Sequence, residues 1–381
     1  MQKINSVIPF NKPWITDLEE AYVLDALKSS RLSGDGPYTH KVEEAFRRRF
    51  GIERFLLTSS GTDALELAFL VAKIEPGDEV ITPSFTFSST VNAFMLRGAV
   101  PVFCDIRPDT MNLDEKKIEA LITPKTKAIV TVDYAGIPCD MDPILTLADA
   151  HQLLVIEDAA QSVGSTYKGR PCGLLGHMGC YSFHETKNFC MGEGGAAIFT
   201  TQEDLREAEM IREKGTNRKE VLKGLVDKYT WHRVGSSFLP SDLLAALLAA
   251  QLERYEEIFD RRMAVWQTYY DGLAQAQEQR WLKRPVVPAY CTHNAHMFNI
   301  QLPTPKDRDE LMSKLKERGI STYICYVPLH SAPLGLNLGE SSCPVTEDLG
   351  ARTLRLPLYA QMEPADALRI VHEITDILGR R

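Results

Sequence analysis

The 381-residue sequence lacks the features expected of a membrane-spanning, secreted or nucleic-acid-binding protein. Its longest apolar segment, residues 243–250, is too short to cross a bilayer. Residues 1–6 do not contain the apolar stretch of a signal peptide. Asp and Glu (51) outnumber Lys and Arg (43), whereas binding to nucleic acid or to an anionic membrane calls for a basic excess. We therefore expect a cytoplasmic protein that binds neither nucleic acid nor membranes.

Cysteine pairs with the spacing of a metal or redox motif are also missing. The eight cysteines are scattered between residues 104 and 343 without a Cys-x-x-Cys pair, which is typical of reduced, packed thiols. Cys172, His177, Cys180 and His184 come nearest to a zinc site, but their spacing matches no ligand template. We predict no metal.

Neither of the two common glycine-rich phosphate motifs is present. The sequence has no Gly-x-x-x-x-Gly-Lys-Ser/Thr and no convincing Gly-x-Gly-x-x-Gly. Glycine (24) and proline (21) are close to average usage, which argues against a collagen-like or disordered chain. The length, with 44% apolar residues, is enough for a large core and for about two domains.

Strand-like and helix-like segments alternate over the first two thirds of the chain. Continuous apolar strands separated by amphipathic helices favour a mostly parallel sheet with helices on both faces. The expected strands are 54–59, 79–82, 100–105, 128–134, 153–157, 180–183 and 196–200. The expected helices between them are 62–73, 88–97, 115–121 and 143–151.

The character of the sequence changes in the last third. A long helix is expected over residues 241–273, and its first part is apolar nearly all round, which indicates burial in a core or at a subunit interface. A strand at 297–302, a charged helix at 306–318 and a strand at 322–326 then indicate a smaller α+β unit. We predict a large domain over residues 1–250 and a small C-terminal domain over residues 251–381.

Several of the expected strands are followed by residues that can take part in catalysis or binding. In such sheets, ligands bind beyond the carboxyl ends of the strands. Ser59-Ser-Gly-Thr62 begins a helix, so it is either a phosphate site or a plain helix cap. Asp158 ends a buried strand and needs a cation, donors or a capping role. Lys187 is either a surface charge or a reactive amine, and the neighbouring His184 either orients a partner or packs.

The order of these motifs resembles the DegT-type sugar aminotransferases, which are pyridoxal-phosphate (PLP) enzymes. The resemblance spans nearly the whole chain. It also implies an α/β fold, the aspartate aminotransferase-like PLP fold type I. The motifs are Ser33-Gly-Asp-Gly-Pro37, Ser59-Ser-Gly-Thr62, Pro83-Ser-Phe-Thr-Phe87, Glu157-Asp-Ala-Ala-Gln161, Ser182-Phe-x-x-x-Lys187, Gly192-Glu-Gly-Gly195, Tyr326-Val-Pro-Leu-His330 and Leu356-Pro-Leu-Tyr359.

The resemblance implies roles for four residues around the cofactor ring. Lys187 would bind the PLP aldehyde covalently and then shuttle protons. Asp158 would face the pyridine nitrogen and keep it protonated, so that the ring acts as an electron sink. Gln161 would hydrogen-bond the ring hydroxyl, and Phe85 would stack on the ring.

The phosphate of the cofactor would be held by the amides of Gly61 and Thr62 and the hydroxyl of Ser182. Many family members have Gly-x-Asn-x-Arg ahead of the long apolar helix, and the Asn reaches this phosphate across the dimer interface. Here Ser237 replaces the Asn and Leu239 the Arg. A serine can donate one hydrogen bond, so Ser237 stays a candidate phosphate contact.

Three further segments, 183–188, 212–218 and 227–231, look most like the dTDP-4-amino-4,6-dideoxygalactose transaminases. That branch implies transfer of an amino group from L-glutamate to the ketone of dTDP-4-dehydro-6-deoxy-D-glucose, in a homodimer with the active site at the subunit interface. The candidate substrate contacts are Ser33, Asp35, His184, Asn217, Tyr326 and His330. His330 could equally be a packed histidine.

Three other functions stay open at this point. The first keeps the class but aminates C3 or uses a different nucleotide sugar. The second is a non-catalytic regulator that senses sugar nucleotides on the same fold, against which Lys187, Asp158 and Gln161 argue together. The third is a PLP-linked dehydratase, whose known sugar-dehydratase relatives carry histidine in place of the lysine.

Overall fold

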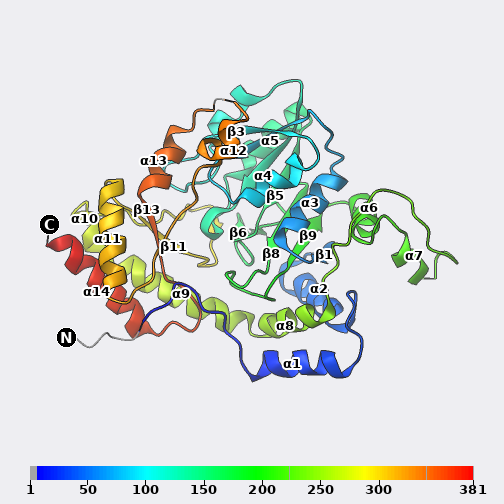
Figure 1. The fold of residues 1–381 in the computed structure, drawn as a ribbon, viewed down its shortest axis with the longest axis horizontal. Coiled ribbons are helices and arrows are strands. Elements are labelled where there is room, and N and C mark those ends of the chain that lie inside the picture. Colours follow the sequence, from blue (N-terminus) through cyan, green and yellow to red (C-terminus); the bar gives the residue numbers. More distant parts are fainter. Residues whose placement is uncertain (1–6, 223, 340, 381) are drawn as a thin grey trace.

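The computed structural model describes residues 7–222, 224–339 and 341–380, so the expectation for residues 1–6 lies outside the described residues. Its centre is a seven-stranded sheet in the order β1-β9-β8-β5-β4-β2-β3 (Figure 1). The five strands from β8 to β3 are parallel to one another, while β9 is antiparallel to both its neighbours. The strands are β1 (Phe55–Thr58), β2 (Glu79–Pro83), β3 (Val100–Cys104), β4 (Thr126–Val132), β5 (Leu154–Asp158), β8 (Met178–Ser182) and β9 (Gly195–Phe199).

Helices cover both faces of this sheet, as the alternation of segments predicts. One face carries α3 (Gly61–Val71), α4 (Ser88–Met95) and α6 (Gln202–Arg212). The other carries α2 (Pro37–Phe50), α5 (Met141–His151) and α8 (Asp242–Glu253). Strand β1 contributes to both cores, Leu56 to the first and Phe55 and Leu57 to the second, because successive side chains of a strand point to opposite faces.

A second, three-stranded antiparallel sheet is built from the last third of the chain. Its order is β11 (Phe298–Gln301), β13 (Thr353–Leu356) and β12 (Tyr323–Ile324). It shares one apolar core with α9 (Tyr255–Gly272), α10 (Ala274–Glu278), α11 (Pro305–Glu317) and α14 (Pro364–Gly379). Ile8 joins this core and pairs with Ile320, so a segment near the start of the chain packs with the C-terminal unit. The domain boundary at residue 250 stays a prediction.

Short elements connect the two units. Strand β10 (Cys291–Thr292) pairs with β6 (Thr166–Tyr167), which also pairs with β7 (Arg170–Pro171). Helices α12 (Pro333–Leu336) and α13 (Pro344–Arg352) follow β12, and the amide of Thr346 in α13 donates to Asp105, just after β3. These contacts fix the C-terminal unit against the carboxyl ends of the parallel strands.

Two expected helices differ from the structure. Residues 115–121 form two short 3₁₀ turns, Glu115–Lys117 and Glu119–Leu121, rather than one helix. The helix expected over 241–273 is broken at Arg254, whose backbone (φ −98°, ψ 21°) is not helical, into α8 and α9. Most of the apolar residues of α8 are buried within the chain against α1 (Asp17–Lys28) and α2, while Leu243, Leu244 and Leu247 stay partly exposed.

Among the described residues, no helix has both the length and the apolar content that crossing a membrane requires.

Candidate active site

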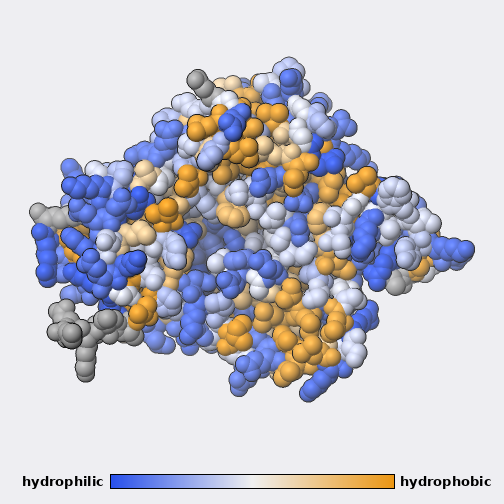
Figure 2. Space-filling view, viewed as in Figure 1, coloured by the Kyte–Doolittle hydropathy of each residue, from blue (hydrophilic) through white to orange (hydrophobic). Residues whose placement is uncertain are grey.

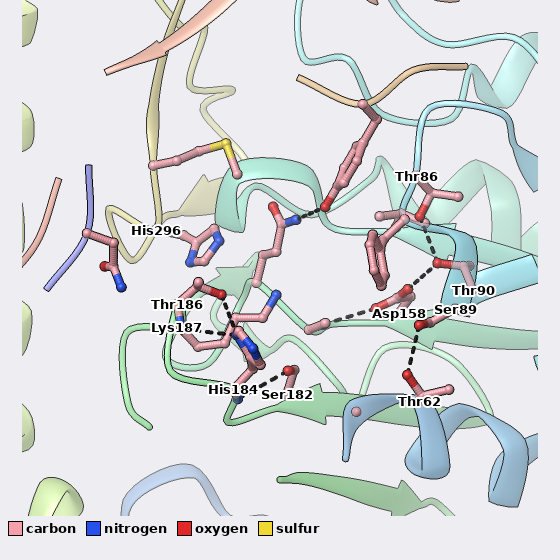
Figure 3. Close-up of a pocket in the computed structure, with 18 of the residues that line it drawn as sticks. Thr62, Thr86, Ser89, Thr90, Asp158, Ser182, His184, Thr186, Lys187 and His296 are labelled. Atoms are coloured by element: carbon pink, nitrogen blue, oxygen red, sulfur yellow. Dashed lines mark hydrogen bonds between the residues drawn. The ribbon is translucent and has the colours of Figure 1, made fainter. Parts of the chain in front are cut away.

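A cavity of about 540 Å³ lies where the parallel strands end and the C-terminal unit meets them. Asp158 comes from the end of β5, Ser182 from the end of β8 and Thr62 from the start of α3. Tyr326 and Arg355 reach it from the C-terminal unit. Figure 2 shows a hollow on this face between the two units, and Figure 3 shows the side chains that line the cavity.

One end of the cavity is suited to an anion. The side chain of Ser60 caps α3 by accepting from the amide of Asp63 at 2.9 Å, while the next amides, of Gly61 and Thr62, have no partner within the helix. A Cβ atom on Gly61 would lie 2.8 Å from the Cβ of Ser182, so only glycine lets the helix start approach β8 this closely. The dipole and free amides of such a helix start attract phosphate groups.

Asp158 is a buried carboxylate held by hydroxyl groups. Its Oδ2 accepts from the Oγ1 of Thr90 at 2.6 Å, and Thr90 Oγ1 is 2.7 Å from Thr86 Oγ1 (Figure 3). Its Oδ1 accepts from the amide of Ala160 at 3.2 Å. Burial raises the pKa of Asp158, and the Thr90 bond opposes that rise. A carboxylate in this setting stabilises a protonated nitrogen placed beside it.

The Gln161 side chain has a fixed orientation. Its Oε1 accepts from the amide of Ala135 at 2.7 Å, so its Nε2 points the other way and donates to the hydroxyl of Tyr326 at 2.9 Å. Burial raises the pKa of Tyr326 to about 12, so this phenol keeps its proton at neutral pH. The Tyr326 O–H can therefore donate to a ligand in the cavity.

Lys187 faces this cavity from the loop between β8 and β9 (Figure 3). Burial lowers the pKa of its amine to about 8, with Asp158 acting against that shift and Arg355 adding to it. An amine with this pKa is partly unprotonated near neutral pH, as a nucleophile or proton carrier must be. His184 lies beside it, and its Nδ1 accepts from the amide of Thr186 at 3.2 Å.

The structure corrects the prediction for Phe85. Its ring is 1% exposed and packs 5.0 Å from the ring of Tyr134, and it is not among the residues that line the cavity. The aromatic residue of this segment that does line the cavity is Phe87, which is 59% exposed. The two phenylalanines are separated by one residue. The motif led us to expect Phe85 in the cavity, whereas Phe87 is the one that lines it.

The predicted substrate contacts Ser33, Asp35 and His330 also lie outside the cavity lining. Asp35 forms an ion pair of 2.7 Å with the fully buried Arg212, and Ser33 is exposed beside it. His330 is 5% exposed, and its Nδ1 lies 2.6 Å from the hydroxyl of Ser84. The packed-histidine interpretation of His330 therefore fits the structure.

Asn217 and Ser237 do not line this cavity either. Asn217 is buried, and its side-chain oxygen accepts from the amide of Thr230 at 2.9 Å. Ser237 is exposed and pairs through its backbone with Glu213. A contact from Ser237 to a cofactor of the same chain is thus not formed, and its cross-subunit role stays a prediction.

The cavity residues that the sequence reasoning missed include His296 and Arg355. Arg355 stands directly before the Leu356-Pro-Leu-Tyr359 motif, which was a usable signal. His296 belongs to no motif that we recognised. Both come from the C-terminal unit, so only the folded chain shows that they face Lys187.

The cysteine and histidine set weighed for zinc does not come together in the part of the chain that the structure describes. The one group of possible ligands found there is Asp133, Glu157 and Cys172, whose nearest atoms lie within 4.8 Å of one another. His177 instead accepts from the amide of Val155 at 3.0 Å.

The cavity has the elements that a pyridoxal cofactor requires. An amine with lowered pKa lies opposite a buried carboxylate, and a helix start that only glycine can form offers amides to a phosphate. When bound, PLP supplies an electron sink that makes the α-proton of an amino acid removable. The fold and the cavity thus define a class, the PLP-dependent aminotransferases of fold type I.

Comparison with known proteins identifies the family. The chain belongs to the DegT/DnrJ/EryC1/StrS aminotransferase family, which it matches over residues 13–375. It is 35% identical to the GDP-perosamine synthase of Caulobacter vibrioides over 96% of this chain and 97% of that protein. It is also 35% identical to the spore coat polysaccharide biosynthesis protein SpsC of Bacillus subtilis, over 99% of each chain.

Solved structures agree with this result. The aminotransferase TlmJ of Streptoalloteichus hindustanus has a TM-score of 0.91 at 30% identity, covering 98% of this chain and 100% of that one. The sugar aminotransferase Spr1654 of Streptococcus pneumoniae, solved in a PLP-form, also has a TM-score of 0.91, at 26% identity over 98% and 99% of the two chains. The protein is therefore a sugar aminotransferase with PLP as its cofactor.

Proposed function

We propose that this enzyme transfers the amino group of L-glutamate to dTDP-4-dehydro-6-deoxy-D-glucose. The products would be 2-oxoglutarate and dTDP-4-amino-4,6-dideoxy-D-galactose. The observation that carries the proposal is the placement of Lys187 in one cavity with Asp158 and Gln161, within a chain whose motifs resemble that branch of the family.

Several of the cavity residues have a part in the proposed reaction. With PLP bound, Asp158 would hold a proton on the pyridine nitrogen, and the amides of Gly61 and Thr62 would bind the cofactor phosphate with the hydroxyl of Ser182. Phe87, in place of the expected Phe85, would cover one face of the ring. Lys187 takes up and returns the proton at its Nζ.

Arg355 supports an acidic amino donor. Its guanidinium lies over the ring of Phe10, 4.9 Å from the ring centroid. Its Nε is buried, and it has no hydrogen-bond partner among the described residues. A buried N–H donor without a partner is costly, and a guanidinium binds carboxylates in a bidentate way. A carboxylate of glutamate would satisfy Arg355 close to Lys187.

The second candidate is the same reaction on another nucleotide sugar. One observation favours it, the 35% identity to a protein named GDP-perosamine synthase. Amination at C3 keeps the same cavity chemistry and stays a further alternative. A regulator without catalysis is disfavoured, because the family is one of aminotransferases and the lysine is present.

We also propose that the enzyme works in the cytoplasm as a homodimer. All eight cysteines are unpaired, and Cys291 alone among them is more than marginally exposed, as suits a reducing compartment. The exposed position of Ser237 fits a contact with a second subunit.

The absorption spectrum of the purified enzyme with PLP tests the proposal. The yellow lysine-bound cofactor should bleach with L-glutamate and recover with dTDP-4-dehydro-6-deoxy-D-glucose. A Lys187→Ala control should show neither change. Recovery only with a GDP-linked keto sugar would replace the acceptor, and no yellow form in the PLP-loaded wild type would refute the proposed reaction altogether.

A further inference from the structure

His296 lines the cavity without a role in the reaction described above. It lies in the segment between β10 and β11, and in Figure 3 its ring is on the same side of the cavity as Lys187. Its Nδ1 is 2.9 Å from the side-chain oxygen of Asn188, the residue after Lys187. The backbone of His296 is fixed as well, because its carbonyl accepts from the Nη2 of Arg262 at 2.7 Å.

The protonation of the ring follows from the orientation of Asn188. The Nδ2 of Asn188 donates to the backbone carbonyl of Asn294 at 2.8 Å, so its Oδ1 must be the atom that faces His296. Asn294 is itself held in place, since its Nδ2 donates to the carbonyls of Gln161 and Val163 at 2.9 and 3.0 Å. An amide oxygen only accepts, so Nδ1 of His296 carries the proton.

The ring is neutral, and its second nitrogen is a free acceptor. Burial lowers the pKa of His296 well below its usual value, and the positive charges of Lys187, Arg262 and Arg355 lower it further. With the proton on Nδ1, the Nε2 atom presents a lone pair. In the described part of the chain, no residue donates to it.

The chemistry of this atom decides which ligand group it accepts. A neutral acceptor repels carboxylate and phosphate oxygens and needs an O–H or N–H donor. Of the two substrates in the proposed reaction, L-glutamate has N–H donors only in the amino group that it transfers, whereas the keto sugar brings hydroxyl groups that take no part in the transfer. Because the keto carbon must come close to Lys187, the hydroxyl that can reach His296 is the one on the neighbouring carbon, C3 of a 4-keto sugar.

We propose that His296 is a substrate-positioning residue whose Nε2 accepts a hydrogen bond from the sugar hydroxyl next to the keto carbon. This inference rests on the proposed function and deepens it. It makes the enzyme selective for keto sugars that keep this hydroxyl, and it gives the Asn188–Asn294 network the task of holding the acceptor in the correct tautomer.

The first test is the His296→Asn variant of the PLP-loaded enzyme, compared in the two half-reactions. Asparagine can still donate to Asn188 from a position near Nδ1, but it has no acceptor at the Nε2 position. We expect kcat/KM for dTDP-4-dehydro-6-deoxy-D-glucose to fall roughly 3- to 10-fold, the loss of one neutral hydrogen bond. The rate of bleaching by L-glutamate should change less than twofold. Equal losses in both half-reactions would contradict the proposal.

A substrate analogue separates a direct contact from a structural effect. For the wild type, the dTDP-4-keto sugar without its 3-hydroxyl should lose the same factor as the variant does with the full substrate. The variant should lose nothing further with the analogue, because the same bond is already missing. If the variant loses a further factor with the analogue, so that the two losses multiply, the proposed hydrogen bond between His296 and the 3-hydroxyl is wrong. A wild type that reacts with the full sugar but not with glutamate would instead refute the proposed donor.

A third measurement does not depend on the catalytic activity of any variant. Histidine ¹⁵N NMR of the PLP-loaded wild type should show an unprotonated Nε2 for His296 at pH 7, with the signal identified by its loss in His296→Asn. Adding dTDP-4-amino-4,6-dideoxy-D-galactose should shift that signal. A protonated Nε2, or a signal that does not move at saturating product, would overturn the inference.

Discussion

Thr90 determines how well Asp158 can serve as a counter-charge inside the cavity. It is fully buried and donates to Oδ2 of Asp158 at 2.6 Å, while the Oγ1 of Thr86 lies 2.7 Å behind it. A hydrogen bond to a charged group contributes about 1.5–3 kcal/mol. Because this bond opposes the rise in the pKa of Asp158 caused by burial, its removal raises that pKa further.

We expect Thr90→Val to weaken PLP binding roughly 10- to 100-fold, and Thr90→Ser to restore most of it. The dissociation constant is measured by titrating the apoenzyme with PLP and following protein fluorescence. Thr62, whose hydroxyl bonds Ser89 at 2.8 Å and not Asp158, provides a matched control in Thr62→Val for changes of volume in the cavity wall. Equal effects of the valine and serine variants would contradict the role given to the hydroxyl.

Alanine substitutions of Phe85 and Phe87 should have different effects, the first on stability and the second on cofactor binding. Phe85 is buried, so Phe85→Ala should cost about 3–5 kcal/mol of unfolding free energy. Phe87 is 59% exposed and lines the cavity, so Phe87→Ala should change stability by less than about 0.5 kcal/mol while PLP binds several-fold more weakly. Urea unfolding of the apoenzyme and PLP titration measure the two quantities. If Phe85→Ala weakened PLP binding and Phe87→Ala lowered stability instead, the prediction made from the motif would hold.

Motifs predicted much of the cavity, and the errors have a physical pattern. The predicted residues that line it are Gly61, Thr62, Asp158, Gln161, Ser182, His184, Lys187 and Tyr326. All but Tyr326 lie at the carboxyl ends of strands of the large sheet, in the loops that follow them or at the start of α3, where ligands bind in such sheets. Asp35, predicted as a substrate contact, lies outside the cavity lining, and a buried arginine far along the chain, Arg212, holds its carboxylate. Such long-range partners leave no mark in local sequence.

At the scale of elements, strands β4 and β5 bring two acidic side chains together beneath the cavity. Asp133 follows β4 and Glu157 is in β5, and both are fully buried. Glu157 accepts from the amides of Gly173 and Leu175 at 2.6 and 3.0 Å, and Asp133 accepts from Ser162 at 2.8 Å. Burial and the neighbouring charge raise the pKa of Asp133 well above its usual value, so we expect the pair to hold one shared proton at neutral pH.

Asp133→Asn should therefore stabilise the protein at high pH. The unfolded chain releases the proton of Asp133 above about pH 4, whereas the folded chain retains it, so wild-type stability falls as pH rises. Asparagine keeps a donor toward Glu157 without that loss. Each 1 kcal/mol gained should raise Tm by about 1 °C at pH 8, because the unfolding entropy of a 381-residue chain is large, and the gain should vanish near pH 4.

Asp105 provides a control for which the expected change in stability at high pH has the opposite sign. It is buried but paired with Lys117 at 2.9 Å, and hydrogen bonds lower its pKa despite burial. Asp105→Asn should destabilise the protein at pH 8, and the loss should shrink as the pH falls through the pKa of the unfolded carboxyl, near 4. Calorimetry of both variants at pH 4.5 and 8 measures the comparison, and a destabilised Asp133→Asn at pH 8 would refute proton sharing.

Elements were predictable where hydrophobic pattern and length agreed. The apolar run that became β8 is buried throughout, and those that became β4 and β5 are buried apart from the exposed Lys127 and the half-buried Leu154, so their position in the sheet followed from composition. The break at Arg254 was not predictable, because the apolar pattern continues across it from Leu252 to Tyr255. The break lies at Arg254 because α8 packs against the large sheet and α9 packs against the C-terminal unit.

At the scale of the whole molecule, exposed apolar side chains gather at two places on the described part of the chain. Leu24 and Leu27 of α1 are 53% and 48% exposed, and Figure 2 shows a hydrophobic cluster over α1 and α8. An arm between α6 and α8, which includes α7 (Arg218–Leu222), carries Tyr229 and Trp231 at 61% and 76% exposed. Patches of this kind mark protein interfaces, and a second copy of this chain is the occupant that the family resemblance implies.

We expect a homodimer with a mass of about twice 42.8 kDa in sedimentation velocity. The double variant Leu24→Glu with Leu27→Glu should shift it to monomer, because two buried carboxylates without partners are costly. It should also bind PLP more weakly if Ser237 contacts the phosphate across the interface. Leu368→Glu on α14, at an equally exposed leucine (58%), should leave the mass and PLP binding unchanged. A monomeric wild type that binds PLP fully would show instead that one chain completes the site alone.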